Sequence, residues 1–169
     1  GTAHVVQTAP SQSFGPISKG ENTPWTHFAQ INEMDGFFIT GRAEDQNFSW
    51  NKLEGTEVVM FGGGQPNAMF RYACYKAGIN FEKIKPITPG SAGAIDTAFR
   101  QGEGQYVQQQ GPFPQQLQAD GIGHIVTQVG PMIGTTAFSS LAAMRNWLDK
   151  DEARAFCRAY RNARAYMNE

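Results

Sequence analysis

The strongest constraint in this sequence is a regular alternation of short apolar runs and helical patterns between residues 57 and 129. Helical segments separate four strand-like runs: Glu57–Phe61, Ile84–Thr88, Gln105–Gln110 and His124–Val129. This alternation is typical of a parallel sheet with crossover helices, and right-handed crossovers place helices on both faces of such a sheet. We therefore predict an α/β fold built on one complete, doubly wound block.

Glycine and small polar residues mark the ends of the predicted helices in this block. The run Gly62–Gly64 opens a helix expected from about Gln65 to Ala77, and Gly78 follows it as a residue free to adopt the left-handed conformation. Ser91 can cap the next helix, which is expected to stop at Gly102. Each predicted helix thus begins directly after a strand end.

The segments that flank this block look like the two ends of a second domain. We expect one complete lobe at residues 42–134, inserted into a partial first lobe that comprises residues 1–41 and 135–169. Two extended crossings would join the lobes, near Gly41–Asn47 and near Gly130–Thr136. A domain inserted through two strands is the layout of a hinged, two-lobed protein.

The first lobe is predicted to contain a long extended stretch and a helical tail. The extended stretch runs from His27 to Thr40 and is interrupted at Asp35-Gly36. Asp149 is the expected N-cap of the tail, whose apolar stripe consists of Ala153, Phe156, Tyr160, Ala163 and Met167. Four arginines opposite this stripe are predicted to form a solvated face: Arg154, Arg158, Arg161 and Arg164.

Charge and cysteine content exclude several classes of protein. The 14 Lys and Arg residues nearly balance 15 Asp and Glu residues, so the net charge of −1 gives no electrostatic reason to bind nucleic acid or an anionic membrane. No apolar run approaches the roughly 20 residues of a spanning helix. The two cysteines, Cys74 and Cys157, are too few for a disulfide framework, and we expect both to be buried free thiols.

The sequence contains no pattern that predicts catalysis, a metal site or a cofactor. Its three histidines do not cluster, and its carboxylates show no paired spacing, so neither a metal centre nor a catalytic triad is expected. The glycine run is one residue short of a dinucleotide fingerprint, because Asn67 stands where the third glycine belongs. The next strand ends at Thr88 where a ribose-binding acid would be needed.

Three strand–helix junctions are candidates for ligand binding, at Thr8–Ser11, Gly62–Asn67 and Thr88–Gly93. Each alone could be a plain turn or cap, but open α/β sheets bind ligands at the carboxyl ends of their strands. A run of amides, Gln108–Gln110, ends another strand, with the first and third amides on one face and the second on the other. These amides could contact a polar ligand or satisfy loop backbone.

Several stretches resemble the substrate-binding proteins of bacterial ABC importers, in the branch for nitrate, taurine, aliphatic sulfonates and thiamine-pyrimidine precursors that is often called NMT1/THI5-like. The resemblance is carried by six segments: Asn32–Ile39, Phe48–Val58, Gly62–Asn67, Tyr75–Ile79, Ala94–Gly102 and Thr136–Phe138. The sequence departs from the family at Gln110-Gly111-Pro112, where a Trp-Glu-Pro-like end is common, and it lacks the cysteine-rich motif of the yeast pyrimidine synthases.

The resemblance implies a fold like that of type II periplasmic binding proteins, with one complete doubly wound lobe and part of a second lobe. It also implies a non-enzymatic, extracytoplasmic protein that closes on a small solute like a venus flytrap and delivers it to an ABC permease in the membrane. The chain would be truncated at both ends relative to the family. The solute would be small, polar, and anionic or zwitterionic.

The residues expected to contact the solute come from both lobes. The first lobe would supply Thr8, Ser11, Trp25 and His27. The second lobe would supply Gly63, Gly64, Gln65, Ser91, Gln110 and Phe113. Backbone N–H groups, hydroxyls and amides among them would hold the solute without a metal or cofactor, and Trp25 and Phe113 would form apolar walls.

Two other functions stay open at this point. One is an enzyme of the THI5-like, pyrimidine-synthesis type on the same scaffold, for which His27 and Asp35 are the visible candidate bases. The other is a truncated sensing or assembly domain without a transport role. In that case the exposed sheet edges of the first lobe would favour a homodimer.

Overall fold

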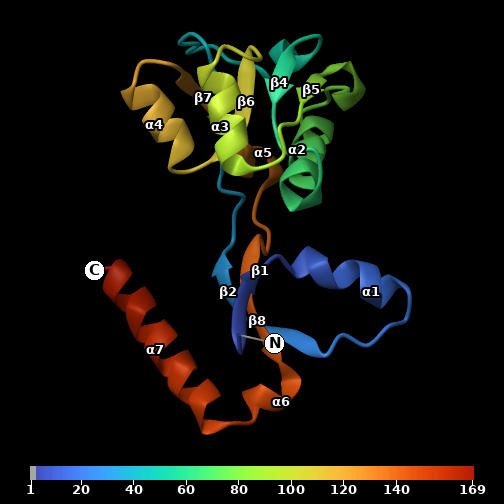
Figure 1. Cartoon of the computed structure of the whole chain (residues 1–169), viewed down its shortest axis with the longest axis vertical. Helices are drawn as coiled ribbons and strands as arrows, with labels where there is room; N and C mark the ends of the chain where they lie inside the picture. Colours follow the sequence, from blue (N-terminus) through green and yellow to red (C-terminus); the bar gives the residue numbers. More distant parts are fainter. Residues whose placement is uncertain (1–2) are drawn as a thin grey trace. The chain divides into compact units, whose positions relative to one another are not determined.

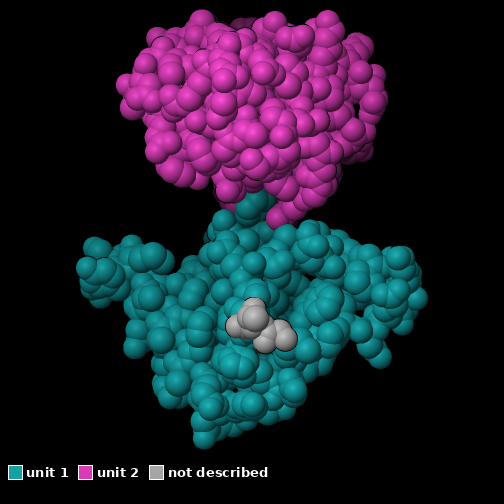
Figure 2. Space-filling model, in the orientation of Figure 1, with its two compact units in different colours: residues 1–33, 137–169 teal, residues 34–136 magenta. Residues whose placement is uncertain are grey.

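The chain divides into two compact units in its computed structural model, which describes residues 3–169. Unit 1 comprises Gly1–Glu33 and Ala137–Glu169, and unit 2 comprises Met34–Thr136 (Figure 2). The chain therefore enters unit 2 between Glu33 and Met34, earlier than the crossing that the sequence suggested near Gly41–Asn47.

Unit 2 contains a five-stranded mixed sheet (Figure 1). Its strands are β3 (Phe37–Gly41), β4 (Glu57–Val59), β5 (Lys85–Ile87), β6 (Tyr106–Gln110) and β7 (His124–Gln128), in the order β5-β4-β6-β3-β7. β4 pairs in parallel with β5 and β6, whereas β3 runs antiparallel to both β6 and β7. The four predicted strands are confirmed, but the sheet is not purely parallel, because β3, which was expected in the first lobe, runs antiparallel between β6 and β7.

Helices cover both faces of this sheet, as the crossover rule predicts. They are α2 (Gly64–Lys76), α3 (Ala92–Arg100), α4 (Phe113–Ala119) and α5 (Val129–Ile133). α2 packs against α5, while α3 and α4 pack over β6. The core between α3, α4 and the sheet includes Ile95, Phe99, Val107 and Leu117, all fully buried. Each such side chain contributes roughly 1.5–3 kcal/mol through burial.

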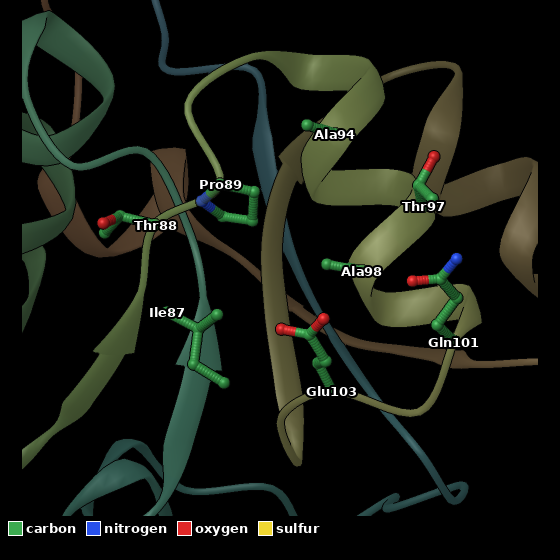
Figure 3. A pocket seen from close by; sticks show the side chains of 8 residues that line it. All are labelled: Ile87, Thr88, Pro89, Ala94, Thr97, Ala98, Gln101 and Glu103. Carbon is green, nitrogen blue, oxygen red and sulfur yellow. The ribbon is translucent and has the colours of Figure 1, made fainter.

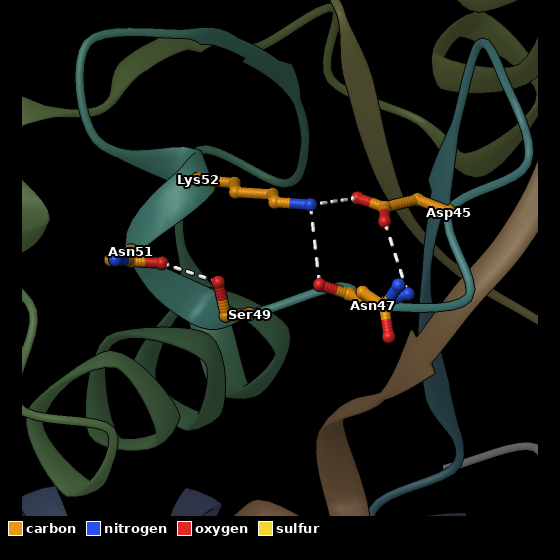
Figure 4. Close-up of polar contacts among 5 residues, drawn as sticks. All are labelled: Asp45, Asn47, Ser49, Asn51 and Lys52. Atoms are coloured by element: carbon orange, nitrogen blue, oxygen red, sulfur yellow. Dashed lines mark hydrogen bonds and ion pairs between the residues drawn. The ribbon is translucent and has the colours of Figure 1, made fainter.

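A polar loop follows the carboxyl end of β3, at the edge of the sheet opposite to the carboxyl ends of the other four strands. There Lys52 Nζ lies 2.6 Å from Asp45 Oδ2 and 3.2 Å from the Asn47 carbonyl oxygen (Figure 4). These bonds hold the loop before the short 3-10 helix η2 (Trp50–Leu53). Arg42 also lies over the Phe99 ring, with 3.6 Å between the guanidinium carbon and the ring centre, which ties the start of the loop to the core.

Unit 1 contains a three-stranded antiparallel sheet of order β1-β8-β2. Its elements are β1 (Val5–Thr8), η1 (Pro10–Ser13), α1 (Phe14–Ser18), β2 (Trp25–Asn32), β8 (Ser139–Met144), α6 (Arg145–Leu148) and α7 (Asp151–Met167). Trp147 and Ala153 are buried together with Ala143 of β8, and Phe28 and Phe156 pack against this cluster. The small core of unit 1 therefore forms between β8 and the helices that follow it.

The structure corrects three expectations for the C-terminal segment. Asp149 does not cap the long helix, because it ends the separate helix α6 and Lys150 is the N-cap of α7. Cys157 is exposed, whereas Cys74 is buried as predicted. Arg164 does not only face solvent: its Nη1 donates to the carbonyl oxygens of Gln30 and Ile31, at 3.1 and 2.9 Å. A long guanidinium can thus satisfy strand carbonyls from the edge of a polar helix face.

Candidate functional site

The carboxyl ends of β4, β5, β6 and β7 meet at one edge of the unit 2 sheet, because these strands run the same way. β3 runs the opposite way, so its first residues join them: Phe37 pairs with Gln110, and Phe38 pairs with Gln128. We call this the carboxyl edge; it consists of residues 35–37, 61–65, 88–91, 110–113 and 128–130. Six predicted contacts lie on it: Gly63, Gly64, Gln65, Ser91, Gln110 and Phe113.

The glycine run has a local physical explanation. A Cβ at Gly62 would lie 3.1 Å from the Thr88 Cβ, so the turns after β4 and β5 approach too closely for a side chain there. Gly64 has φ +68°, which favours glycine. Asn67 Nδ2 donates to the Phe61 carbonyl at 3.0 Å and closes the turn, in place of the third glycine of a dinucleotide fingerprint. The N-cap of α2, Gly63, has no side chain with which to accept from the first-turn N–H groups.

Two buried amides on β6 hold the helix starts in place. Gln108 Nε2 donates to the Pro66 carbonyl of α2 at 3.2 Å, and Gln109 Nε2 donates to the Ala92 carbonyl of α3 at 2.9 Å. The predicted alternation of faces is confirmed, since the two amides reach helices on opposite sides. Both are fully buried, so these two satisfy backbone, whereas Gln110 is exposed. Satisfying backbone was one of the two roles predicted for these amides, but their partners at the helix starts are distant in sequence and were not predicted.

Ser91 acts as the N-cap of α3, where its hydroxyl accepts from the Ala94 N–H at 3.2 Å. The predicted cap is thus confirmed, and the hydroxyl is already engaged. No acidic residue occupies the first turn of α2, α3, α4 or α5. Uncompensated helix N-termini carry partial positive charge, which favours an anion at the starts of these helices.

Asp35 is the acidic residue of the carboxyl edge, and its environment is costly. Its side chain is 5% exposed; Oδ1 accepts from the Phe37 N–H at 2.7 Å, and Oδ2 is buried without a hydrogen-bond partner among the described residues. Burial raises the pKa of this carboxyl from 3.8 to about 6, against the smaller lowering effect of the Phe37 hydrogen bond. A buried carboxylate oxygen without a hydrogen-bond partner destabilises the folded state.

The four predicted contacts in unit 1 lie on β1, η1 and β2. Three of them form a network with two serines that the sequence did not single out, Ser13 and Ser140. His27 Nε2 lies 2.9 Å from Ser13 Oγ, and its Nδ1 lies 2.7 Å from Ser140 Oγ. Trp25 Nε1 donates to Ser13 Oγ at 3.1 Å, and Ser140 Oγ donates to the Thr8 carbonyl at 3.4 Å.

The remaining contact, Ser11, lies on η1 and is partly buried. Sequence reasoning could not find Ser140, because its strand β8 begins more than a hundred residues after His27, and no pattern around Ser13 set it apart from other serines. Both ring nitrogens of His27 already have hydroxyl partners within unit 1.

A surface hollow of about 530 Å³ runs along α3 of unit 2 (Figure 3). It extends from Thr88 and Pro89, at the carboxyl edge, past Thr97 to Glu103 at the other end of the helix. None of the ten predicted contacts lines it. A smaller hollow of about 170 Å³ in unit 1 is lined in part by Trp25.

Neither a metal-binding group nor a membrane-spanning helix occurs in the part of the chain that the structure describes. Within residues 3–169, no three His, Cys, Asp or Glu side chains are grouped so that they could hold a metal ion. No helix in this range combines the length and the apolar character needed to cross a membrane.

Comparison with known proteins relates the chain to binding proteins. No protein-family model matches it. It is 32% identical over 137 residues to YtlA of Bacillus subtilis (strain 168), which is provisionally designated a binding protein; the match covers 80% of this chain and 41% of YtlA.

Solved structures give the same relation at the level of the fold. The periplasmic aliphatic sulphonate binding protein SsuA from Escherichia coli matches with a TM-score of 0.71 and 19% identity, over 92% of this chain and 52% of SsuA. The periplasmic nitrate-binding protein NrtA from Synechocystis PCC 6803 matches with a TM-score of 0.60 and 15% identity, over 88% of this chain and 43% of NrtA.

These likenesses confirm the predicted fold class: the chain has the α/β fold of periplasmic binding proteins, with a mixed sheet. It spans about half the length of the solved structures that it matches, and less than half of YtlA.

Proposed function

We propose that this chain is an extracytoplasmic solute-binding protein, or the corresponding portion of one, which captures a small oxyanion or a zwitterion that carries an anionic group. The observation that carries the proposal is the carboxyl edge of unit 2. There α2 and α3 begin without an acidic residue in their first turns, and the N-cap Gly63 leaves room for a ligand. Helix starts of this kind bind anions through backbone N–H groups and the helix dipole.

The class of solute follows from chemistry and from the relatives together. SsuA is described as a sulphonate-binding protein and NrtA as a nitrate-binding protein. Both ligands are compact oxyanions, whose oxygens accept several hydrogen bonds from N–H groups. The near-neutral net charge of the chain fits recognition by backbone and amides better than recognition by a basic patch. Phe113, on the same edge of unit 2, would add an apolar contact. An ABC permease in the membrane would be the partner that receives the solute.

A substitution at Gly63 tests this proposal. Gly63 has extended backbone with φ −168° and no atom within 4 Å of an added Cβ, so Gly63→Asp and Gly63→Ala can both be accommodated. Aspartate at an N-cap accepts from first-turn N–H groups and stabilises the helix, but its charge repels an anion from the same place. Alanine adds neither the acceptor nor the charge and is the matched control.

The measurement is binding of ethanesulfonate and of nitrate by calorimetry and native mass spectrometry, with choline as a cationic probe. We expect an anionic probe to bind the unaltered chain and the Ala variant. The Asp variant should bind at least about tenfold more weakly, which corresponds to about 1.4 kcal/mol, while it unfolds no earlier. Equal binding to the Asp and Ala variants, or binding of choline alone, would overturn the proposal.

A further inference from the structure

Asp35 is a buried acid to which the fold gives no positive partner. One oxygen, Oδ1, accepts from the Phe37 N–H, while Oδ2 has no hydrogen-bond partner within residues 3–169. None of the ion pairs in that range includes Asp35. Asp96 shows the contrast: its Oδ1 is also buried without a partner, but Arg100 Nε lies 2.7 Å from its Oδ2 and supplies the countercharge. A positive group on a ligand would supply the same to Asp35.

The Asp35 carboxyl lies on the same edge of unit 2 as the start of α2, where the anionic group of the solute is proposed to bind. The Phe37 ring packs edge-on against the Phe61 ring, with 5.8 Å between ring centres, and Phe61 directly precedes the glycine run that opens α2. The carboxyl is bonded to the Phe37 N–H at 2.7 Å. This edge therefore offers N–H donors to an anionic group and a carboxylate to a cationic group.

A small group can reach this carboxyl from solvent. Asp35 itself is 5% exposed, but Met34 before it and Gly36 after it are both exposed. A Cβ added at Gly36 would meet no atom within 4 Å, so there is open space beside the residue next to Asp35. The Met34 side chain on the other side is unbranched and adaptable.

Gln108 adds a second buried acceptor near the start of α2. Its Nε2 donates to the Pro66 carbonyl in the first turn of α2 at 3.2 Å, whereas its Oε1 has no partner among the described residues. The edge thus combines N–H donors at the helix start with two acceptors that lack a donor. A plain oxyanion such as nitrate brings acceptors only, but a solute that also carries an ammonium group brings up to three donors.

We propose that Asp35 is a specificity-determining residue, which binds the ammonium group of a solute whose anionic group is held at the start of α2. The solute is then a zwitterion and not a plain oxyanion. This inference rests on the proposed function and narrows the class of its solute. The same carboxylate would disfavour an anion that carries no positive group, because it places a second negative charge on the edge.

The test compares two sulfonates that differ at the end remote from the anionic group. Taurine carries an ammonium group where ethanesulfonate carries a hydrogen atom. Binding of each to the unaltered 169-residue chain is measured by calorimetry, well above the Asp35 pKa of about 6. We expect taurine to bind at least about tenfold more tightly, the effect of one charge-assisted hydrogen bond.

Two variants assign the preference to a residue. Asp35→Asn keeps an acceptor oxygen for the Phe37 N–H and removes the charge. It should bind ethanesulfonate at least as tightly as the unaltered chain does, which shows that it is folded, and it should bind taurine no more tightly than ethanesulfonate. Glu33→Gln is the matched control, because it removes an exposed carboxylate two residues away. This control should keep the preference for taurine.

The outcomes separate this inference from the proposed function. If ethanesulfonate binds the unaltered chain as tightly as taurine, or if the preference for taurine survives in Asp35→Asn, Asp35 does not select the solute, and the proposed function stands without this inference. A preference lost in Glu33→Gln would assign it to the wrong carboxylate and overturn the inference in the same way. If neither sulfonate binds, both the inference and the proposed function fail.

Discussion

Replacement of Asp35 by Asn should stabilise unit 2 at neutral pH. Burial raises the pKa of the Asp35 carboxyl from its ordinary value of 3.8 to about 6, because the charged form is poorly solvated. The folded chain then holds the proton more tightly than the unfolded chain does. The contribution of this proton to the free energy of unfolding is therefore fully present below pH 3.8. It is lost as the pH rises through about 6.

The expected magnitude follows from the same two values. At about 1.4 kcal/mol per pH unit, the interval from 3.8 to about 6 corresponds to about 3 kcal/mol of lost stability above pH 6. Asparagine keeps the acceptor for the Phe37 N–H but carries no charge. Asp35→Asn should therefore exceed the unaltered chain in stability by up to about 3 kcal/mol at neutral pH, and the difference should vanish below pH 3.8.

Hydrogen exchange of the core strands β4 and β6 is a suitable assay, because it follows unit 2 separately from unit 1. Glu33→Gln is the matched control: it removes one carboxylate two residues away, on an exposed side chain. This control should change neither the stability nor its pH dependence. The reasoning about burial is refuted if Asp35→Asn is less stable than the unaltered chain at neutral pH. It is also refuted if the difference in stability between the two chains is the same at neutral pH and below pH 3.8.

Two substitutions and one chemical reaction test the packing of unit 2 and the exposure of the two thiols of the chain. Gly130→Ala should destabilise unit 2 by about 1–3 kcal/mol in denaturant unfolding, because its Cβ would lie closer than 3.0 Å to backbone, whereas Gly93→Ala should cost nothing. Ser91→Ala should cost about 1 kcal/mol in the same assay through loss of the α3 cap. A thiol reagent should modify exposed Cys157 quickly, whereas Cys74, whose pKa burial raises to about 12, should react only on unfolding; equal rates would contradict this.

The parts of the fold that were predictable are those recorded in local patterns. The strands and helices of residues 57–129, the Ser91 cap and the left-handed Gly78 each depend on residues close in sequence, and the structure has them all. β3 was recognised as extended, but its partners were not. An apolar run such as Phe37–Gly41 pairs equally well in either direction, and its position between β6 and β7 is decided by long-range packing.

The candidate site shows the same boundary between local and long-range information. The glycine turn and the end of β6 were identified from residue types, because glycines and amides after strands have few structural alternatives. The bracing amides Gln108 and Gln109, and the serines around His27, gain their roles from contacts over 14 to 113 residues. Residue type alone gave Ser13 and Ser140 no distinction from any other serine in the chain.

The energetics of the carboxyl edge argue that it is shaped for more than stability. Asp35 Oδ2 and Gln108 Oε1 are both buried without a hydrogen-bond partner among the described residues. Gln108 lies on the sheet face that α2 covers, and Asp35 lies on the carboxyl edge just before β3. Each such atom costs about 1–3 kcal/mol, which apolar residues of similar volume would avoid. Such costs fit the proposed binding role of this region better than a fold arranged for maximal stability alone.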